Sequence, residues 1–201
     1  LESGGYDTPR GHAALVRMNK QHGRFQIPND EYLYTLSTFI LEPIRWNEKY
    51  GRRPLTETER QASYYFWREI GRRMGIRDIP ESLAAFDQFN RDFEAAEFRY
   101  SPDNEIIALA TRNLFLSWFL PKSLWRIGAP FIHALLDDRL LGAVGLQPAP
   151  RWLQVAVRAA VRWRGRLEGL LPPRRKPRLL TQIRTRTYSD GYVISELGAV
   201  R

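Results

Sequence analysis

Most of the sequence is made of long segments in which apolar residues recur every three or four positions, the period of an amphipathic α-helix. Proline and glycine separate these segments, and helices are expected to end at such residues. No series of segments alternates apolar and polar residues as half-buried strands do. The pattern therefore predicts an all-α fold, a single helical domain of about seven helices.

The expected helices follow from the positions of these breaks. They cover approximately residues 11–25, 29–50, 56–74, 81–99, 101–119, 121–141 and 149–170. Thr56 and Glu59 have the spacing of a capping box, and Asn29 or Asp30 can cap the second helix. Pro43 is expected to kink the second helix or to end it early, because proline lacks the N–H that a helix interior uses.

The helical domain is expected to span residues 1–171, with an extended basic tail over residues 172–201. Three prolines among residues 172–177 favour extended backbone at the start of this tail. The dipeptide Asp190-Gly191 is compatible with a short hairpin within residues 187–197. Because the chain opens on Leu-Glu-Ser-Gly-Gly without a methionine, we interpret it as a fragment or a processed chain.

Positive charge is concentrated at the C-terminal end of the chain. Residues 151–201 contain twelve lysines and arginines but only three acidic residues, and this excess accounts for the whole net charge of +9. The first 150 residues are balanced, with 19 basic and 19 acidic side chains. The sequence thus describes a neutral helical body with a basic end rather than a uniformly basic protein.

The absence of cysteine excludes several classes of site. Disulfides, thiolate nucleophiles, iron–sulfur clusters and cysteine zinc sites all need a residue that this chain lacks. No signal peptide is recognisable, and the most apolar stretch, residues 106–120, is too short to cross a bilayer and contains Arg112. The expected location is cytoplasmic, with membrane association left open.

The common catalytic motifs are also absent. The sequence has no glycine-rich phosphate loop, no HExxH and no Glu-x-x-His pair, which argues against phosphate-loop, zinc-protease and carboxylate di-iron proteins. The Asp137-Asp138 pair lacks a further acidic residue one turn on, so it is interpreted as a solvated pair at a helix terminus.

Three histidines remain as candidate ligands. His12 lies at the start of the first helix and is expected to be exposed, whereas His133 stands in an apolar run and is expected to be a buried structural residue. His22 shares a helical stripe with Leu15 and Met18, so its ring is expected to face the interior.

Burial would keep the His22 imidazole neutral, with one nitrogen lone pair available. Such a ring can bind haem iron while its other N–H donates to a carbonyl one turn back, that of Met18. The alternative is an ordinary hydrogen-bonded core histidine. Composition and spacing alone favour this alternative, so the ligand role needs a further argument.

Short runs in a fixed order supply that argument. They are Tyr6-Asp7-Thr8-Pro9-Arg10-Gly11, residues 17–25, residues 29–39, Leu55-Thr56-Glu57-Thr58-Glu59-Arg60, residues 66–71, Met74-Gly75-Ile76, Ile79-Pro80, Pro172-Pro173-Arg174 and residues 188–198. Together they resemble the superfamily that contains the latex-clearing rubber oxygenases and the mpaB-type oxygenases of fungal meroterpenoid biosynthesis. The resemblance extends over nearly the whole chain, and the ordered combination carries it.

The resemblance implies an all-α, partly globin-like body that binds haem b. In that family a helical histidine in this context is the proximal iron ligand, and it corresponds to His22. The implied reaction is oxidative cleavage of a C=C bond in an isoprenoid or other apolar substrate, with dioxygen as co-substrate. Phe25 and Phe39 are candidate pocket walls, although ordinary core packing is the simpler interpretation of both.

The resemblance also implies that part of the family domain is missing. The family's distal motif, an arginine close to a threonine, lies upstream of the proximal histidine and ahead of the first residue of this chain. The N-terminal helices that would cover the distal haem face are therefore expected to be absent. The fragment alone is expected to be inactive.

The last long helix carries Arg151, Arg158, Arg162 and Arg166 at spacings of seven, four and four, which places them on one face. Trp152 and other apolar residues lie beside them, as in a helix that rests on anionic lipid and makes a peripheral membrane contact. The other interpretation, which we prefer on sequence alone, is a solvated basic face with the tryptophans turned inward.

A second function remains open beside the oxygenase. The chain could be a non-catalytic helical binding module that uses its basic end for acidic lipid or nucleic acid. No nucleic-acid-binding motif is present, so a nucleic-acid partner is not expected. The sequence does not determine the oligomeric state or the substrate.

Overall fold

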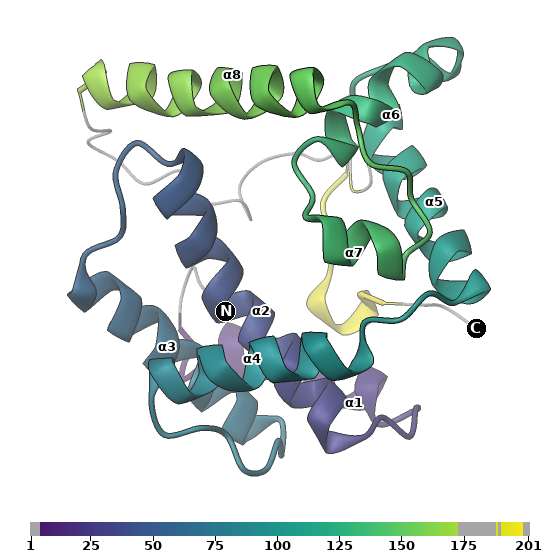
Figure 1. Cartoon of the computed structure of the whole chain (residues 1–201). Helices are drawn as coiled ribbons and strands as arrows, with labels where there is room; N and C mark the ends of the chain where they lie inside the picture. Colours follow the sequence, from purple (N-terminus) through teal and green to yellow (C-terminus); the bar gives the residue numbers. More distant parts are fainter. Residues whose placement is uncertain (1–4, 173–187, 189, 199–201) are drawn as a thin grey trace. The chain divides into compact units, whose positions relative to one another are not determined.

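The computed structural model describes residues 5–172, 188 and 190–198. These residues form eight α-helices and two short 3-10 helices and contain no strand, which confirms the all-α prediction (Figure 1). The elements are α1 (Pro9–His22), α2 (Asn29–Tyr50), α3 (Glu57–Arg73), α4 (Leu83–Glu97), α5 (Pro102–Ser117), η1 (Lys122–Leu124), α6 (Trp125–His133), α7 (Asp138–Ala143), α8 (Arg151–Leu170) and η3 (Ile194–Glu196). A globin-like arrangement stays a prediction.

Most predicted helix boundaries hold to within a few residues. The capping box is formed, since Thr56 Oγ1 accepts from the Glu59 N–H (3.3 Å) and Glu59 Oε2 accepts from the Thr56 N–H (2.8 Å). Of the two outcomes predicted for Pro43, the early end of α2 is wrong, because the helix continues to Tyr50, and the kink stays a prediction. Asn29 starts α2, but its side-chain amide bonds to the backbone of Arg77 instead of capping the helix.

The first helix is shorter than predicted. It ends at His22 because Gly23 closes it, with the Gly23 N–H donating to Asn19 O at 2.9 Å. The Phe25 N–H then donates to His22 O (3.0 Å) in a turn, so Phe25 leaves the stripe that Leu15 and His22 share. Its side chain is 68% exposed.

The segment predicted over residues 121–141 is divided into η1, α6 and the start of α7. Asp137 caps α7, and its carboxylate accepts from the Leu140 N–H at 2.8 Å. Asp138 follows in the first turn, and both carboxylates are exposed. The expected role of this acidic pair at a helix terminus is confirmed.

The chain divides into two units. The first contains Leu1–Pro43, Thr56–Asp87 and Pro172–Arg201. Its buried apolar residues include Leu15, Leu33, Leu36, Ile40, Tyr64 and Ile70. In this unit α3 approaches α2 closely at Gly71, where a Cβ atom would lie 2.5 Å from Leu36 Cδ2.

The second unit contains Ile44–Leu55 and Gln88–Leu171. Here α6 packs against both α5 and α8 (Figure 1). Ala134, Ala149 and Leu153 form a buried cluster with Val157 packed on it. At Gly165, a Cβ atom would overlap the Tyr50 carbonyl oxygen, so α8 lies directly against the end of α2. The predicted boundary at residue 171 stays a prediction.

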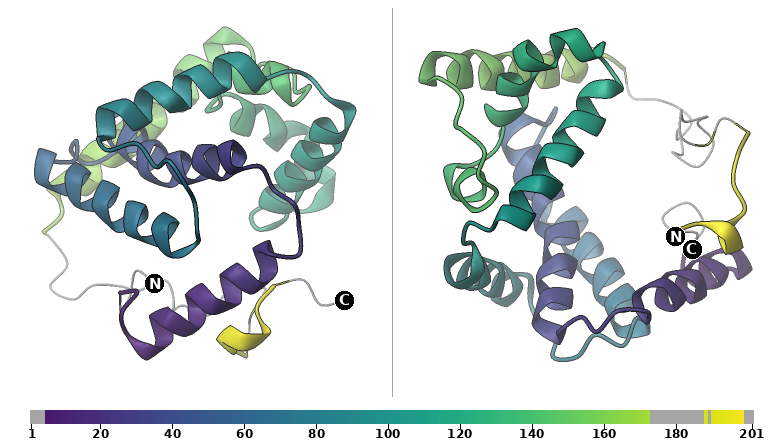
Figure 2. Two further views of the ribbon diagram at one scale, coloured as in Figure 1. Left: turned by 90° about the horizontal axis from the view of Figure 1, so that it is seen from below. Right: turned by 90° about the vertical axis from the view of Figure 1, so that its right-hand side faces the viewer.

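The C-terminal segment, residues 190–198, lies against α1 through η3. Residues 173–187, which include most of the run predicted to be extended, lie outside the described residues. Among the described residues of the predicted hairpin, 188 and 190–197, there is no strand, and Ile194–Glu196 forms the 3-10 helix η3 instead. Both views in Figure 2 show this segment, in yellow, beside α1 in purple.

The two longest helices, α2 and α8, have 22 and 20 residues. Within the part of the chain that the structure describes, no helix combines the length and the apolar character needed to cross a membrane.

Candidate functional site

The candidate site is built on α1, and the start of this helix is fixed locally. Thr8 caps the helix, because its Oγ1 accepts from the Gly11 N–H and donates to Gly5 O, both at 3.1 Å. Pro9 occupies the first helical turn, where its missing N–H costs nothing. Gly11 is buried against Gly5, and a Cβ atom at residue 11 would overlap the Gly5 carbonyl oxygen.

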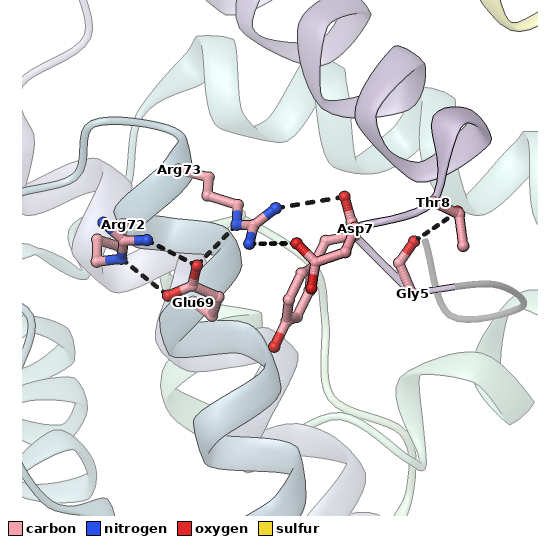
Figure 3. Close-up of polar contacts among 7 residues, drawn as sticks. Gly5, Asp7, Thr8, Glu69, Arg72 and Arg73 are labelled. Atoms are coloured by element: carbon pink, nitrogen blue, oxygen red, sulfur yellow. Dashed lines mark hydrogen bonds and ion pairs between the residues drawn. The ribbon is translucent and has the colours of Figure 1, made fainter.

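An ion network joins the start of α1 to the end of α3, as Figure 3 shows. Arg73 donates through Nε to Glu69 Oε1 (2.7 Å) and through a terminal nitrogen to Asp7 Oδ1 (2.6 Å). Its guanidinium also donates to Tyr6 O (3.3 Å) and lies 4.3 Å from the centre of the Tyr6 ring. Arg72 makes two bonds of 2.8 Å to the same Glu69 carboxylate.

These contacts determine the charge state of Glu69. Hydrogen bonds from Arg72, and then from Arg73, lower the pKa of the Glu69 carboxyl to about 2. The carboxylate therefore stays ionised at neutral pH, and it keeps Arg73 oriented toward Asp7 and the start of α1.

The other end of α1 is held by asparagine side chains that bond to backbone groups at and after the end of α3. Asn19 Nδ2 donates to Arg73 O at 3.1 Å, which binds the last turns of α1 to the end of α3. After the loop, the Asn29 side chain donates to Arg77 O (3.0 Å) and accepts from the Arg77 N–H (2.9 Å). His22 lies between these two attachments.

His22 is half-buried, and its Nδ1 makes the predicted bond to Met18 O, at 3.0 Å. A carbonyl oxygen can only accept, so Nδ1 carries a proton, and in the neutral ring Nε2 keeps its lone pair. Within the described residues Nε2 has no hydrogen-bond partner. The ring of Tyr32 meets the His22 ring edge-on, with 5.8 Å between centres and 72° between planes.

His22 lines a cavity of about 350 Å³. The other lining residues are Arg10, Ala14, Arg17, Met18, Gln21, Tyr192, Ile194, Leu197 and Gly198. One wall is therefore α1 and the other is the C-terminal segment. Arg17 Nε donates to Leu197 O and holds the two walls together.

The residues that line the cavity include apolar side chains and side chains that can donate hydrogen bonds. Ala14, Met18 and Leu197 supply apolar surface, whereas Arg10 and Arg17 supply positive charge. The side-chain nitrogen of Gln21 is buried and has no acceptor among the described residues. Buried donors are normally paired, so an acceptor-bearing ligand would suit this position.

The two phenylalanines predicted as pocket wall do not line this cavity. Phe25 lies in the loop after α1, where it is exposed. Phe39, on α2, stacks on Trp67 with 4.7 Å between ring centres and 16° between planes. Its packing partner is therefore α3, and the cavity at His22 gives neither residue a role.

The other two histidines lie where the sequence predicted. His12 is exposed on α1. His133 is only 8% exposed, its Nδ1 donates to Gln147 O (2.8 Å), and burial lowers its pKa. Across the described residues there is no group of three or more histidine, aspartate and glutamate side chains that could hold a metal ion.

The arginines of α8 do not form one solvated face. Arg158 is half-buried and donates to Ala134 O (2.9 Å) and Leu136 O (3.4 Å), the carbonyls that follow α6. Arg151, Arg162 and Arg166 are exposed. The prediction of inward-turned tryptophans is wrong, since Trp152 and Trp163 are 71% and 60% exposed.

Sequence reasoning missed two parts of the site. The Glu69–Arg73 pair has the i,i+4 spacing of helical ion pairs and could have been found from that signal. Asp7 and the wall at residues 192–198 carry no such signal, because their partners lie far away in the sequence.

Comparison of the sequence with known proteins places the chain in a family. The sequence profile of the family described as "ER-bound oxygenase mpaB/B'/Rubber oxygenase, catalytic domain" matches residues 6–166. The chain belongs to this family. The match includes the whole of α1 with His22. It ends before residues 192–198, which form the second wall of the cavity at His22.

Individual relatives agree with the assignment to the mpaB/rubber oxygenase family. The chain is 29% identical over 182 residues to the ER-bound oxygenase mpaB' of Penicillium brevicompactum, a match to 82% of this chain and 43% of that protein. It is 26% identical over 151 residues to the ER-bound oxygenase mpaB of Penicillium roqueforti (strain FM164), covering 67% of this chain and 50% of that protein. The chain thus spans half or less of the length of these relatives.

Proposed function

We propose that this chain forms part of a haem b-dependent oxygenase in which His22 is the proximal iron ligand. The observation that carries the proposal is the state of the His22 ring. Its Nδ1 proton is committed to Met18 O at 3.0 Å, so the Nε2 lone pair is left for a metal.

The residues around His22 fit such a group. A haem has an apolar macrocycle and two carboxylate substituents, and the cavity offers apolar side chains together with cationic and amide donors. Arg10, Arg17 and the unpaired Gln21 nitrogen suit the carboxylates.

Each part of the site would have a distinct task. The bond from Nδ1 to Met18 O would fix the ring orientation and make Nε2 a stronger electron donor. Ala14, Met18 and Leu197 would exclude water from the bound group. The Glu69–Arg73–Asp7 network would hold α1, and with it His22, in place. Bound haem would supply the redox chemistry with dioxygen.

The reaction that we propose is oxidative cleavage of a C=C bond in an isoprenoid or other apolar substrate. It is supported by membership of a family whose described members are oxygenases. The relatives are also described as ER-bound, which supports membrane association of this chain. The rival function, a non-catalytic binding module, is not favoured by any of these similarities.

The test is an absorption spectrum of the protein produced with a sufficient supply of haem. We expect a Soret band, and we expect His22→Ala to weaken haem binding by roughly tenfold or more. The matched control is His12→Ala, because His12 is an exposed histidine on the same helix. This control should leave the spectrum unchanged.

A second variant separates loss of the ligand from loss of the fold. In His22→Gly, added imidazole should restore the Soret band by entering the space that the side chain leaves. If the folded wild-type chain binds no haem, or if His22→Ala binds it with an unaltered spectrum, the proposal is wrong. Helicity measured by circular dichroism establishes that each variant is folded.

A further inference from the structure

The outer face of α8 carries an apolar strip that the second unit does not cover. Its members are Trp152, Val155, Trp163, Leu167 and Leu170, all of them exposed. The opposite side of the helix carries Leu153, Val157 and Gly165, which pack inward. At 100° per residue the exposed set falls on one side of the helix, so α8 has two apolar faces and uses only one of them.

Arginines run along one edge of this strip. Arg151, Arg162 and Arg166 lie next to Val155, and all three are exposed. Arg164 lies farther round the helix and pairs with Glu168 at 2.7 Å. Among the described residues, neither Arg151 nor Arg166 has a carboxylate partner.

We propose that this face of α8 binds the surface of an anionic lipid bilayer, with the helix lying in the plane of the headgroups. Trp152, Trp163 and Leu170 would enter the boundary between headgroups and acyl chains, where the amphipathic indole ring is well solvated. Arg151, Arg162 and Arg166 would reach the phosphate and carboxylate groups of the lipids. This inference names the membrane-binding surface and does not depend on haem binding by His22.

The composition of the strip favours lipid over a covering protein segment. The exposed apolar residues of α5 differ from this strip in the charges beside them. Ile106, Ile107 and Leu114 are exposed on α5, but the charged residues of its first turn are acidic and Arg112 is half-buried. On α8, an apolar covering segment would remove the exposed arginines from water, which is costly unless anionic groups meet them. Anionic lipid headgroups supply such groups.

Binding to vesicles tests the charge part of the proposal. We expect the 201-residue chain to bind vesicles of phosphatidylcholine and phosphatidylserine more tightly than vesicles of phosphatidylcholine alone. Each exposed arginine near the surface contributes roughly a fivefold gain in affinity. The double variant Arg151→Gln/Arg166→Gln should therefore bind the anionic vesicles roughly 10- to 30-fold more weakly. Added salt should weaken wild-type binding.

The matched control removes the same charge elsewhere. Arg77 and Arg99 are exposed and lie outside α8, so the double variant Arg77→Gln/Arg99→Gln has the same net charge as the test variant. We expect its vesicle binding to change less than about twofold, because those side chains are not at the membrane. Equal losses in the two double variants would overturn the proposal, since net charge alone would then explain binding.

Tryptophan fluorescence tests the apolar part. Lipids with brominated acyl chains should quench the wild-type chain, and Trp152→Ser/Trp163→Ser should remove most of this quenching. In buffer without vesicles, acrylamide should quench Trp152 and Trp163 readily, because both are exposed. If acrylamide does not reach them, or if bromolipid quenching survives in the double variant, the strip is covered by something other than lipid and the proposal fails. Circular dichroism verifies that the variants keep their helicity.

Discussion

Arg73 in the first unit and Arg158 in the second perform the same structural task with different partners. Each is a half-buried arginine that joins one helix to a distant segment. Arg73 bonds to the carboxylates of Glu69 and Asp7, whereas Arg158 bonds to the backbone carbonyls of Ala134 and Leu136. The first contact depends on two ionised carboxylates, whereas the acceptors of the second are neutral carbonyl groups.

This difference predicts how each unit responds to its surroundings. Ion pairs weaken when salt screens them or when acid neutralises the carboxylate. Bonds from a guanidinium to carbonyl oxygens keep their donor and acceptor over the whole range of working pH, because arginine does not lose its proton there. The placement of α1 should therefore be sensitive to acid and salt, and the contact between α8 and α6 should be insensitive.

The largest expected effect is that of Arg158→Gln. Hydrogen bonds that involve a charged group contribute about 1.5–3 kcal/mol, and glutamine is too short to reach both carbonyls. We expect the free energy of unfolding, measured by urea titration, to fall by about that amount. Arg166→Gln is the control on the same helix and should change stability by about 0.5 kcal/mol or less. Equal effects of the two changes would show that Arg158 is not structural.

A smaller effect is expected when Arg73 is replaced, and the comparison with Arg72 sharpens it. Arg73 bonds to Glu69, Asp7 and Tyr6, whereas Arg72 bonds to Glu69 alone. Arg73→Gln should therefore lower the melting temperature more than Arg72→Gln does. The difference between the two variants should shrink in high salt. A difference that salt does not alter would contradict an ionic origin.

The smallest effect is the contribution of Glu69 to the pH dependence of stability. Because the pKa of this carboxyl is about 2 in the folded chain, against an ordinary value of 4.5, the unfolded chain takes up the proton first as pH falls. Its stabilising contribution is complete above pH 4.5 and is lost between about pH 4.5 and 2. The free energy of unfolding, measured by urea titration at several pH values in this range, should fall less steeply with decreasing pH in Glu69→Gln than in the wild-type chain. The same pH dependence in both proteins would mean that Glu69 titrates normally.

Local features of the fold could be predicted from the sequence. The capping box at Thr56, the acidic start of α7 and the bond from His22 to Met18 each involve residues within four positions of one another. Such contacts depend on helix geometry, which the sequence pattern reports directly. The helical period alone was enough to predict α8 to within two residues of its observed start.

Contacts between distant segments could not be predicted. The spacing of the α8 arginines groups Arg158 with Arg162 and Arg166, but helical spacing does not show which edge of a face meets a neighbouring helix. Only the position of α6 assigns Arg158 to the interior. The end of α1 was misjudged because Phe25 continues the apolar spacing beyond Gly23, and the turn at that glycine overrode the pattern.

The bond between Arg17 and Leu197 joins residues that are 180 positions apart, which has a consequence for the order of folding. During synthesis the helix with His22 emerges well before the segment that forms the opposite wall. Contacts of such long range are slow to form, because a long loop must close before they contribute. The pocket can therefore be completed only after translation has passed residue 198, and until then the ribosome-bound chain would carry α1 with that side open to solvent and to chaperones.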